Sequence, residues 1–153
     1  MSAATQAWGE RLHAQGYRIT PQRQFVLEAV TDLGHATPEE ILAWVQTKSS
    51  GVNLSTVYRA LEVLEEVGLV THAHLGHGAP TYHAVDEEVH VHLVCAGCRE
   101  IDSVPAQMAQ VFVDSLERDR GFATDIGHMS VQGLCRRCRE AGKPARSRGV
   151  DRA

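Results

Sequence analysis

Four cysteines, arranged as two identical motifs, carry the strongest chemical signal in this 153-residue sequence. Cys95 and Cys98 form one C-x-x-C motif, and Cys135 and Cys138 form the other. Each motif presents two thiols from one tight turn, and two such turns supply the tetrahedral sulfur shell that zinc prefers. No cysteine lies outside the two motifs, which favours a closed, structural zinc site.

A redox C-x-x-C site and a disulfide are the alternative interpretations of these cysteines. The N-terminal residues lack the basic start and apolar core of a secretory signal, so we expect a cytoplasmic protein, where permanent disulfides are rare. Neither motif lies in the β-α-β pattern that carries thioredoxin-type sites. We therefore favour zinc, which would also contribute folding energy to a domain poor in aromatic residues.

Histidines form the second signal, and two pairs of them have the spacing H-x-H. His90 and His92 lie in a predicted strand, where alternate side chains share a face, so their rings can converge on one ion. His72 and His74 repeat this spacing in an earlier predicted strand. Glu88 shares the face of His90 if that strand extends backwards. Imidazoles suit Ni(II), Zn(II) and Cu(II) better than Ca(II) or Mg(II), and do not distinguish nickel from zinc.

The other histidines give weaker signals. His83 fits a regulatory metal ligand and a half-buried strand residue equally well. His128 falls in a predicted strand, on a face that the pattern does not assign. We interpret His13 as a polar helix residue and His77, which lies between two glycines, as a turn residue.

Three helices and a two-stranded ribbon are predicted before residue 85. The helices begin at Thr20-Pro21, at a capping box that starts at Thr37, and at Asn53, and the third helix ends at Gly68. Strands 69–71 and 81–83, joined by a turn at 76–80, complete the layout of a winged helix-turn-helix. The apolar positions at helical spacing are Val26, Val30, Leu33, Ile41, Trp44, Val45, Val57, Ala60, Leu61, Leu64 and Val67.

The remaining sequence predicts a second, small α+β unit. Its expected elements are strands at 90–95 and near 101–104, a helix at 105–120, and a strand near 124–134. The helix carries Met108, Val111, Phe112 and Leu116 on one side. We thus expect an α+β protein with a DNA-binding domain at 1–85, a hinge at 86–88, a second domain at 89–142 and a disordered basic tail at 143–153.

The composition excludes one class of interaction and limits another. No apolar run approaches the roughly 20 residues that a membrane-spanning helix needs, so we expect a soluble protein with no membrane partner. The formal net charge is −4, so any nucleic-acid binding must come from a local basic patch.

The order and spacing of these motifs resemble the ferric uptake regulator family. The resemblance covers most of the chain and is carried by GYRITPQR at 16–23, STVYR at 55–59, HVHLVC-x-x-C at 90–98 and the second C-x-x-C motif. It implies a homodimeric, metal-dependent transcriptional regulator with an N-terminal winged helix and a C-terminal dimerisation domain. It also implies that the protein is not an enzyme and has no small-molecule substrate.

Within that family, the stretch from His72 to His83 is most similar to the nickel-responsive branch. The resemblance implies that His72, His74 and His128 are nickel ligands, and that the protein is a nickel-responsive repressor with zinc at its cysteines.

A regulatory site between the two domains is also implied by the resemblance. His35, His90 and His92 fall on that site. Glu88 stands where the nickel-responsive branch has a fourth histidine, which adds charge and hardness to the donor set.

The third predicted helix has the pattern of a recognition helix, whose N-terminal residues reach the major groove. Tyr58 and Arg59 are our candidates for base contacts. Ser55 and Thr56 are candidates for phosphate contacts, helped by the helix N-terminus. By resemblance, Arg18 and Arg23 contact the DNA backbone or minor groove. The expected partner is a pseudo-palindromic double-stranded operator, bound by a dimer.

The sequence also permits other interpretations of the function. Within the same family, the chain could be a zinc- or iron-responsive regulator or a peroxide sensor, for which Asp102 lies near the position of a carboxylate ligand. A zinc metalloenzyme is the alternative from a different class, because H-x-H with a distant histidine matches a three-ligand catalytic shell. That reading lacks a general base and leaves the winged helix unexplained.

Overall fold

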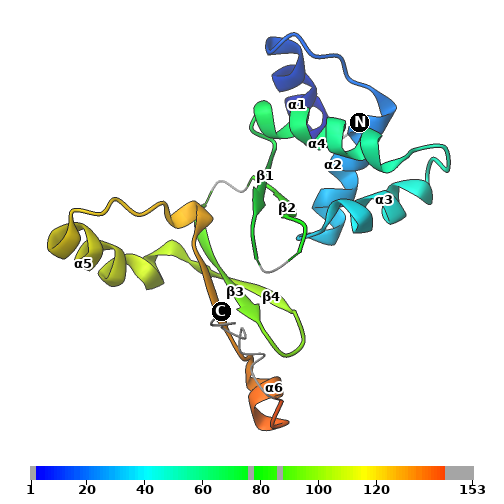
Figure 1. Cartoon of the computed structure of the whole chain (residues 1–153). Helices are drawn as coiled ribbons and strands as arrows, with labels where there is room; N and C mark the ends of the chain where they lie inside the picture. The colour runs from blue at the N-terminus through cyan, green and yellow to red at the C-terminus, as the bar shows by residue number, and fades with distance from the viewer. Residues whose placement is uncertain (1–2, 76–77, 86–87, 144–153) are drawn as a thin grey trace, which may run out of the picture. The chain divides into compact units, whose positions relative to one another are not determined.

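The computed structural model describes residues 3–75, 78–85 and 88–143. The turn residue His77, hinge residues 86 and 87 and tail residues 144–153 lie outside that description. The chain divides into two compact units, Met1–Asp86 and Glu87–Ala153, drawn in Figure 1. Helices and small sheets are combined in an α+β fold, as the sequence predicts.

The first unit contains four helices followed by a two-stranded ribbon. Its elements are α1 (Ala3–Ala14), α2 (Pro21–Leu33), α3 (Pro38–Gln46), α4 (Leu54–Glu66), β1 (Val70–Ala73) and β2 (Thr81–Ala84). Helix α1 precedes the three helices whose starts were predicted, and it contains His13, which was interpreted as a polar helix residue. Its bounds were not predicted because its sequence has no continuous apolar stripe. Its Leu12 is nevertheless fully buried.

The starts of the other three helices are those that the sequence predicts. The Thr20 side chain accepts a hydrogen bond from the Arg23 N–H, and Asn53 caps α4 in the same way. Thr37 and Glu40 form a reciprocal capping box. These side chains satisfy backbone donors that a helix leaves unpaired at its first turn.

A single hydrophobic core holds α2, α3 and α4 together. The predicted face of α4 is buried at Val57, Ala60, Leu61 and Leu64. Leu33, by contrast, is 42% exposed, so its predicted place in the core is wrong. It lies in the last turn of α2, where the chain leaves the core through Gly34 at a φ of 75°. Trp44 and Val67 are only half-buried.

The ribbon of β1 and β2 is antiparallel, and a backbone bridge connects it to the segment before α3. Thr71 pairs with His83 and His72 pairs with Tyr82. Tyr82 also exchanges two backbone hydrogen bonds with Ala36, of 2.8 and 3.0 Å, in the segment before α3. This bridge brings the residues that flank Ala36 close to the residues that flank Tyr82.

The second unit is a three-stranded sheet with helical segments. Strand β3 (His90–Cys95) lies between β4 (Ile101–Pro105), which is antiparallel to it, and β5 (Ser130–Gly133), which is parallel. The predicted helix at 105–120 begins as a 3-10 turn, η1 (Ala106–Ala109), and continues as α5 (Gln110–Arg120). A second 3-10 turn, η2 (Ile126–His128), precedes β5, and α6 (Arg136–Glu140) follows it.

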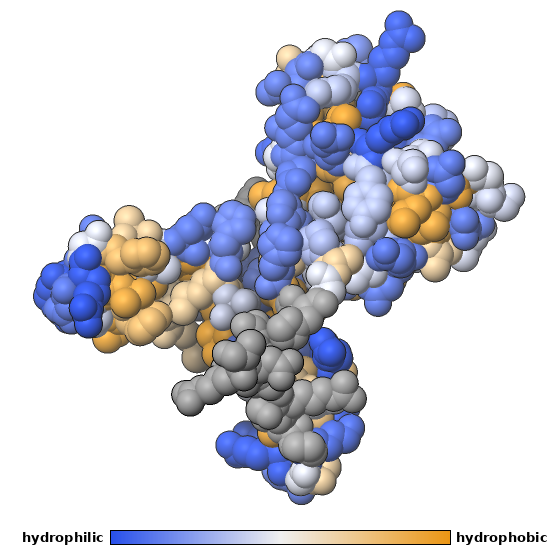
Figure 2. Space-filling view, viewed as in Figure 1, coloured by the Kyte–Doolittle hydropathy of each residue, from blue (hydrophilic) through white to orange (hydrophobic). Residues whose placement is uncertain are grey.

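One expectation for this unit needs correction. His128 ends η2 rather than lying in a strand, because Asp125 caps that turn through the Gly127 N–H. The apolar side of the helix is not buried within the unit: Met108, Val111 and Phe112 are 73%, 80% and 55% exposed. Figure 2 shows apolar residues gathered over α5. Among the described residues, no helix is both long and apolar enough to cross a membrane.

Replacement of Leu61 tests the core of the first unit. Leu61 is fully buried, so Leu61→Ala should lower the free energy of unfolding by about 2–5 kcal/mol. Urea denaturation followed by circular dichroism measures this loss. The neighbouring exposed residue provides the control, since Glu62→Ala should change stability by less than about 0.5 kcal/mol. Equal losses in the two variants would contradict the assignment of this core.

Candidate metal centres and nucleic-acid interface

The four cysteines come together in the second unit. Strands β3 and β5 are parallel neighbours, with Cys95 opposite Gly133, so both C-x-x-C turns leave the same edge of the sheet. The four Sγ atoms lie within 4.8 Å of one another, and those of Cys98 and Cys135 are 3.9 Å apart. A zinc–sulfur bond of about 2.3 Å implies sulfur–sulfur edges of about 3.8 Å in a tetrahedron. The donor set therefore fits a zinc ion.

Backbone N–H groups near these thiols favour the thiolate form of Cys95. Backbone N–H groups of Cys135 and Gly97 donate to the Cys95 Sγ at 3.3 and 3.4 Å. The first of these, with others nearby, lowers the pKa of Cys95 to about 6. Burial raises the pKa of the Cys138 thiol to about 12. A divalent ion would displace the remaining protons from the set on binding.

Gly97 is the residue that allows the two turns to approach so closely. A Cβ atom at this position would lie 2.9 Å from the Cys138 Sγ and 3.2 Å from a methyl carbon of Leu134. Both distances are shorter than ordinary van der Waals contact, so the residue between the first two cysteines must be small.

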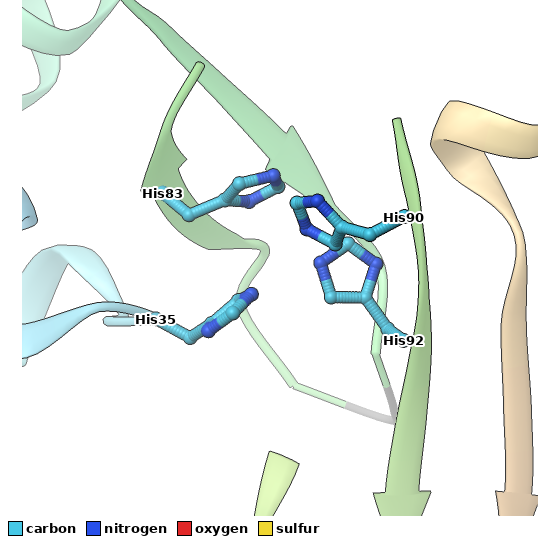
Figure 3. A group of neighbouring side chains, drawn as sticks. All are labelled: His35, His83, His90 and His92. Atoms are coloured by element: carbon cyan, nitrogen blue, oxygen red, sulfur yellow. The ribbon is translucent and has the colours of Figure 1, made fainter. Parts of the chain in front are cut away.

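A histidine pair lies beside the Ala36–Tyr82 bridge in the first unit. His35 precedes Ala36, and His83 follows Tyr82, so the Ala36–Tyr82 bridge brings their rings to a centroid separation of 4.9 Å. His83 is 6% exposed. Figure 3 shows the two rings facing each other. His83 thus joins the candidate ligands, as one of the two readings of this residue suggested.

A second pair lies on strand β3. His90 and His92 project from the same face, with ring centroids 4.8 Å apart (Figure 3). His92 is 1% exposed, whereas His90 is half-buried. The His90 Nδ1 lies 3.2 Å from the backbone carbonyl oxygen of Glu88, whose side chain is exposed.

Asp102, the residue considered for a peroxide sensor, lies on the other face of this sheet. It pairs with Leu93 on β3, whereas His92 pairs with Ser103. Directly opposite residues in a ladder share a face, and successive residues alternate. Asp102 is therefore directed away from His90 and His92.

The three histidines proposed as nickel ligands are divided between the units. His72 and His74 lie at β1 with ring centroids 5.4 Å apart. The His72 Nδ1 contacts the Glu65 Oε1 on α4. In the second unit, the His128 Nδ1 lies 2.8 Å from the Asp125 Oδ2, and this hydrogen bond lowers the pKa of Asp125.

The start of α4 presents the predicted DNA contacts at the surface. Ser55 and Arg59 are exposed, and Tyr58 is 41% exposed. The Thr56 hydroxyl donates to the Asn53 Oδ1 at 3.1 Å, so it belongs to the helix cap as well as to this surface.

Arg23 is held in place beside α2. Its guanidinium donates to the Arg18 carbonyl oxygen at 2.6 Å and lies over the Tyr17 ring, 5.4 Å from the centroid. The Tyr17 hydroxyl in turn donates to Glu66 on α4 at 2.6 Å. Arg18 itself has an exposed side chain.

Comparison with known proteins gives a consistent answer. The model of the ferric uptake regulator family matches residues 14–132. The ferric uptake regulation protein of Bacillus subtilis is 31% identical over 134 residues, which cover 84% of this chain and 90% of the relative. A solved ferric uptake regulator from Helicobacter pylori has a similar fold, with a TM-score of 0.73, 20% identity and coverage of 88% of this chain and 91% of that one.

A zinc uptake regulator solved in complex with zinc and DNA is 25% identical, with a TM-score of 0.58 and coverage of 93% of this chain and 99% of that one. The family match spans well over half of the sequence. This chain therefore belongs to the ferric uptake regulator family, a family of metal-responsive transcriptional regulators.

Proposed function

We propose that this protein is a nickel-responsive transcriptional repressor that acts in the cytoplasm and binds a pseudo-palindromic operator as a homodimer. The observation that carries the metal dependence in this proposal is the presence of a close histidine pair in each unit, at His35 and His83 and at His90 and His92.

One metal ion bound by both pairs would link the DNA-binding unit to the second unit. Only six residues separate His83 from His90, so the two pairs are at high effective concentration. The ion stabilises the linked arrangement because it binds that state more tightly than the unlinked one. If operator DNA also binds the linked arrangement more tightly, the metal ion raises the affinity for DNA. The exposed side chain of Glu88 can add a carboxylate to this set.

Nickel is proposed for the set of His72, His74 and His128, on the basis of resemblance to the nickel-responsive branch. These are three imidazole donors, and nitrogen donors bind Ni(II) more tightly than Fe(II) or Mn(II). Because two ligands lie in the first unit and one in the second, this ion would also link the units.

Zinc is proposed for the four cysteines in a structural role. Four thiolates complete a tetrahedral shell and leave no open position for substrate. When bound, the ion supplies a crosslink between the two turns, while the protein supplies backbone N–H groups that stabilise the Cys95 thiolate.

The dimer interface is proposed at the exposed apolar side of α5. Met108, Val111 and Phe112 form this side, and Phe122 just beyond the helix is 59% exposed. Contiguous exposed apolar side chains mark interaction surfaces, and a two-fold dimer buries the same patch from both copies. Such a dimer presents two copies of α4 to the two halves of a palindrome.

An iron- or zinc-responsive regulator is the alternative function. The similar proteins include one whose name refers to iron, the ferric uptake regulation protein, and one whose name refers to zinc, the zinc uptake regulator. DNA binding measured with buffered free Ni(II), Zn(II), Fe(II) and Mn(II) separates these alternatives.

Removal of His72 and His74 together tests the nickel response. The His72→Ala/His74→Ala variant should lose nickel-dependent DNA binding but keep its fold and dimer, because both residues lie on the ribbon outside the hydrophobic core. Gel shifts would use a duplex selected from a random library with the nickel-loaded wild type. His13→Ala, at an exposed helix position, is the control. A double variant that still required nickel for DNA binding would refute this ligand assignment.

Gly97 allows a test of zinc binding that leaves all four thiols in place. In Gly97→Ala, the new methyl group meets the Cys138 Sγ, so zinc retention during dialysis against a chelator should fall at least tenfold. Metal analysis of the dialysed protein measures the effect. Gly133→Ala is the matched control, because a Cβ there meets no atom within 4 Å. Equal zinc retention in both variants would contradict the proposed close packing.

Arg59 tests the DNA interface. Arg59→Ala should weaken operator binding by about 1–3 kcal/mol and relax the preference at the contacted base pair, whereas loss of a phosphate contact would weaken all sequences alike. Fluorescence anisotropy with matched and mismatched duplexes at two salt concentrations measures both quantities. Arg120→Ala, an exposed arginine of the second unit, should bind like the wild type. An unaltered affinity in Arg59→Ala would remove this residue from the interface.

A further inference from the structure

Two histidines in different units share the same local arrangement. The His72 Nδ1 contacts the Glu65 carboxylate, and the His128 Nδ1 lies 2.8 Å from the Asp125 carboxylate. Each carboxylate belongs to the same unit as its histidine, so neither contact depends on how the units are placed.

This arrangement selects one nitrogen of each ring for metal binding. A neutral imidazole carries one N–H and one lone pair. Since the carboxylate can only accept when ionised, the proton resides on Nδ1 and the lone pair on Nε2. A carboxylate behind a metal-bound histidine also fixes the ring orientation and raises the basicity of the ligating nitrogen.

The Asp125 carboxylate is itself held by a second hydrogen bond. The other oxygen of Asp125 accepts a hydrogen bond from the Gly127 N–H at 3.1 Å, which fixes the rotamer that faces His128. Glu65 lies on α4, and its side chain is 35% exposed, as is that of His72.

We propose that Glu65 and Asp125 are positioning residues of the nickel site, which hold His72 and His128 as Nε2 donors. The inference rests on the proposed nickel function of these histidines. The two carboxylates also offset the charge of a divalent ion bound by neutral imidazoles. Glu65 also connects His72, a proposed nickel ligand on the ribbon, to helix α4, which carries the proposed DNA contacts Tyr58 and Arg59.

The experiment compares nickel affinities of the full-length, zinc-loaded protein by competition with a chromogenic chelator. Glu65→Ala and Asp125→Ala should each weaken nickel binding 10- to 100-fold. Glu65→Gln and Asp125→Asn should lose less, because an amide oxygen can still accept from the Nδ1–H. Thermal midpoints without nickel are recorded for every variant, and Glu62→Ala controls for the loss of a carboxylate elsewhere on α4.

His72→Ala separates this inference from the function on which it rests. If His72→Ala abolishes nickel binding at this site while Glu65→Ala and Asp125→Ala keep wild-type affinity, the positioning role is refuted and the nickel site stands. If His72→Ala binds nickel like the wild type, both proposals fail. Losses in the alanine variants that parallel a drop in the nickel-free thermal midpoint, with no recovery in the amide variants, would show a structural role and overturn the inference.

Discussion

Strand β3 imposes the constraint on which two of the candidate metal centres depend. Side chains alternate along a strand, so His90 and His92 lie on one face of the sheet and Cys95 lies on the other. Hydrogen bonds to β4 and β5 hold both edges of this strand. Six residues thus direct imidazoles to one site and a thiol to another, and a shift of register by one residue would exchange the two faces.

Much of the fold could be predicted because its local signals are strong. Capping residues set the starts of α2, α3 and α4, and the helical spacing of Val57, Leu61 and Leu64 sets the buried face of α4. The bounds of helix α1 were not predicted, although His13 was interpreted as a helix residue, because the sequence there has little apolar periodicity. The second unit was predicted less well. His128 lies on a 3-10 turn rather than a strand, since a short capped turn and a strand end look alike in sequence.

The candidate sites also differ in how much of each could be predicted from the sequence. The cysteine cluster could be predicted, because the spacing within each motif forces two thiols together and only the pairing of the motifs needs the sheet. The partnership of His35 and His83 could not, because it depends on a bridge between Ala36 and Tyr82, residues that are far apart in sequence. The contacts of Glu65 and Asp125 with histidines were also missed, since the position of an acidic residue in the sequence does not by itself indicate its partner.

The two C-x-x-C turns also have a consequence for chain entropy. Cys98 and Cys135 are 37 positions apart, and the segment between them contains β4, α5 and β5. For a disulfide that closes a loop of this size, the loss of entropy in the unfolded chain corresponds to about 4 kcal/mol of stability, and we apply the same treatment to a metal crosslink. An ion held by the four sulfurs would thus act as a reversible crosslink. Its departure would loosen the segment that displays the apolar side of α5, the surface proposed for the dimer.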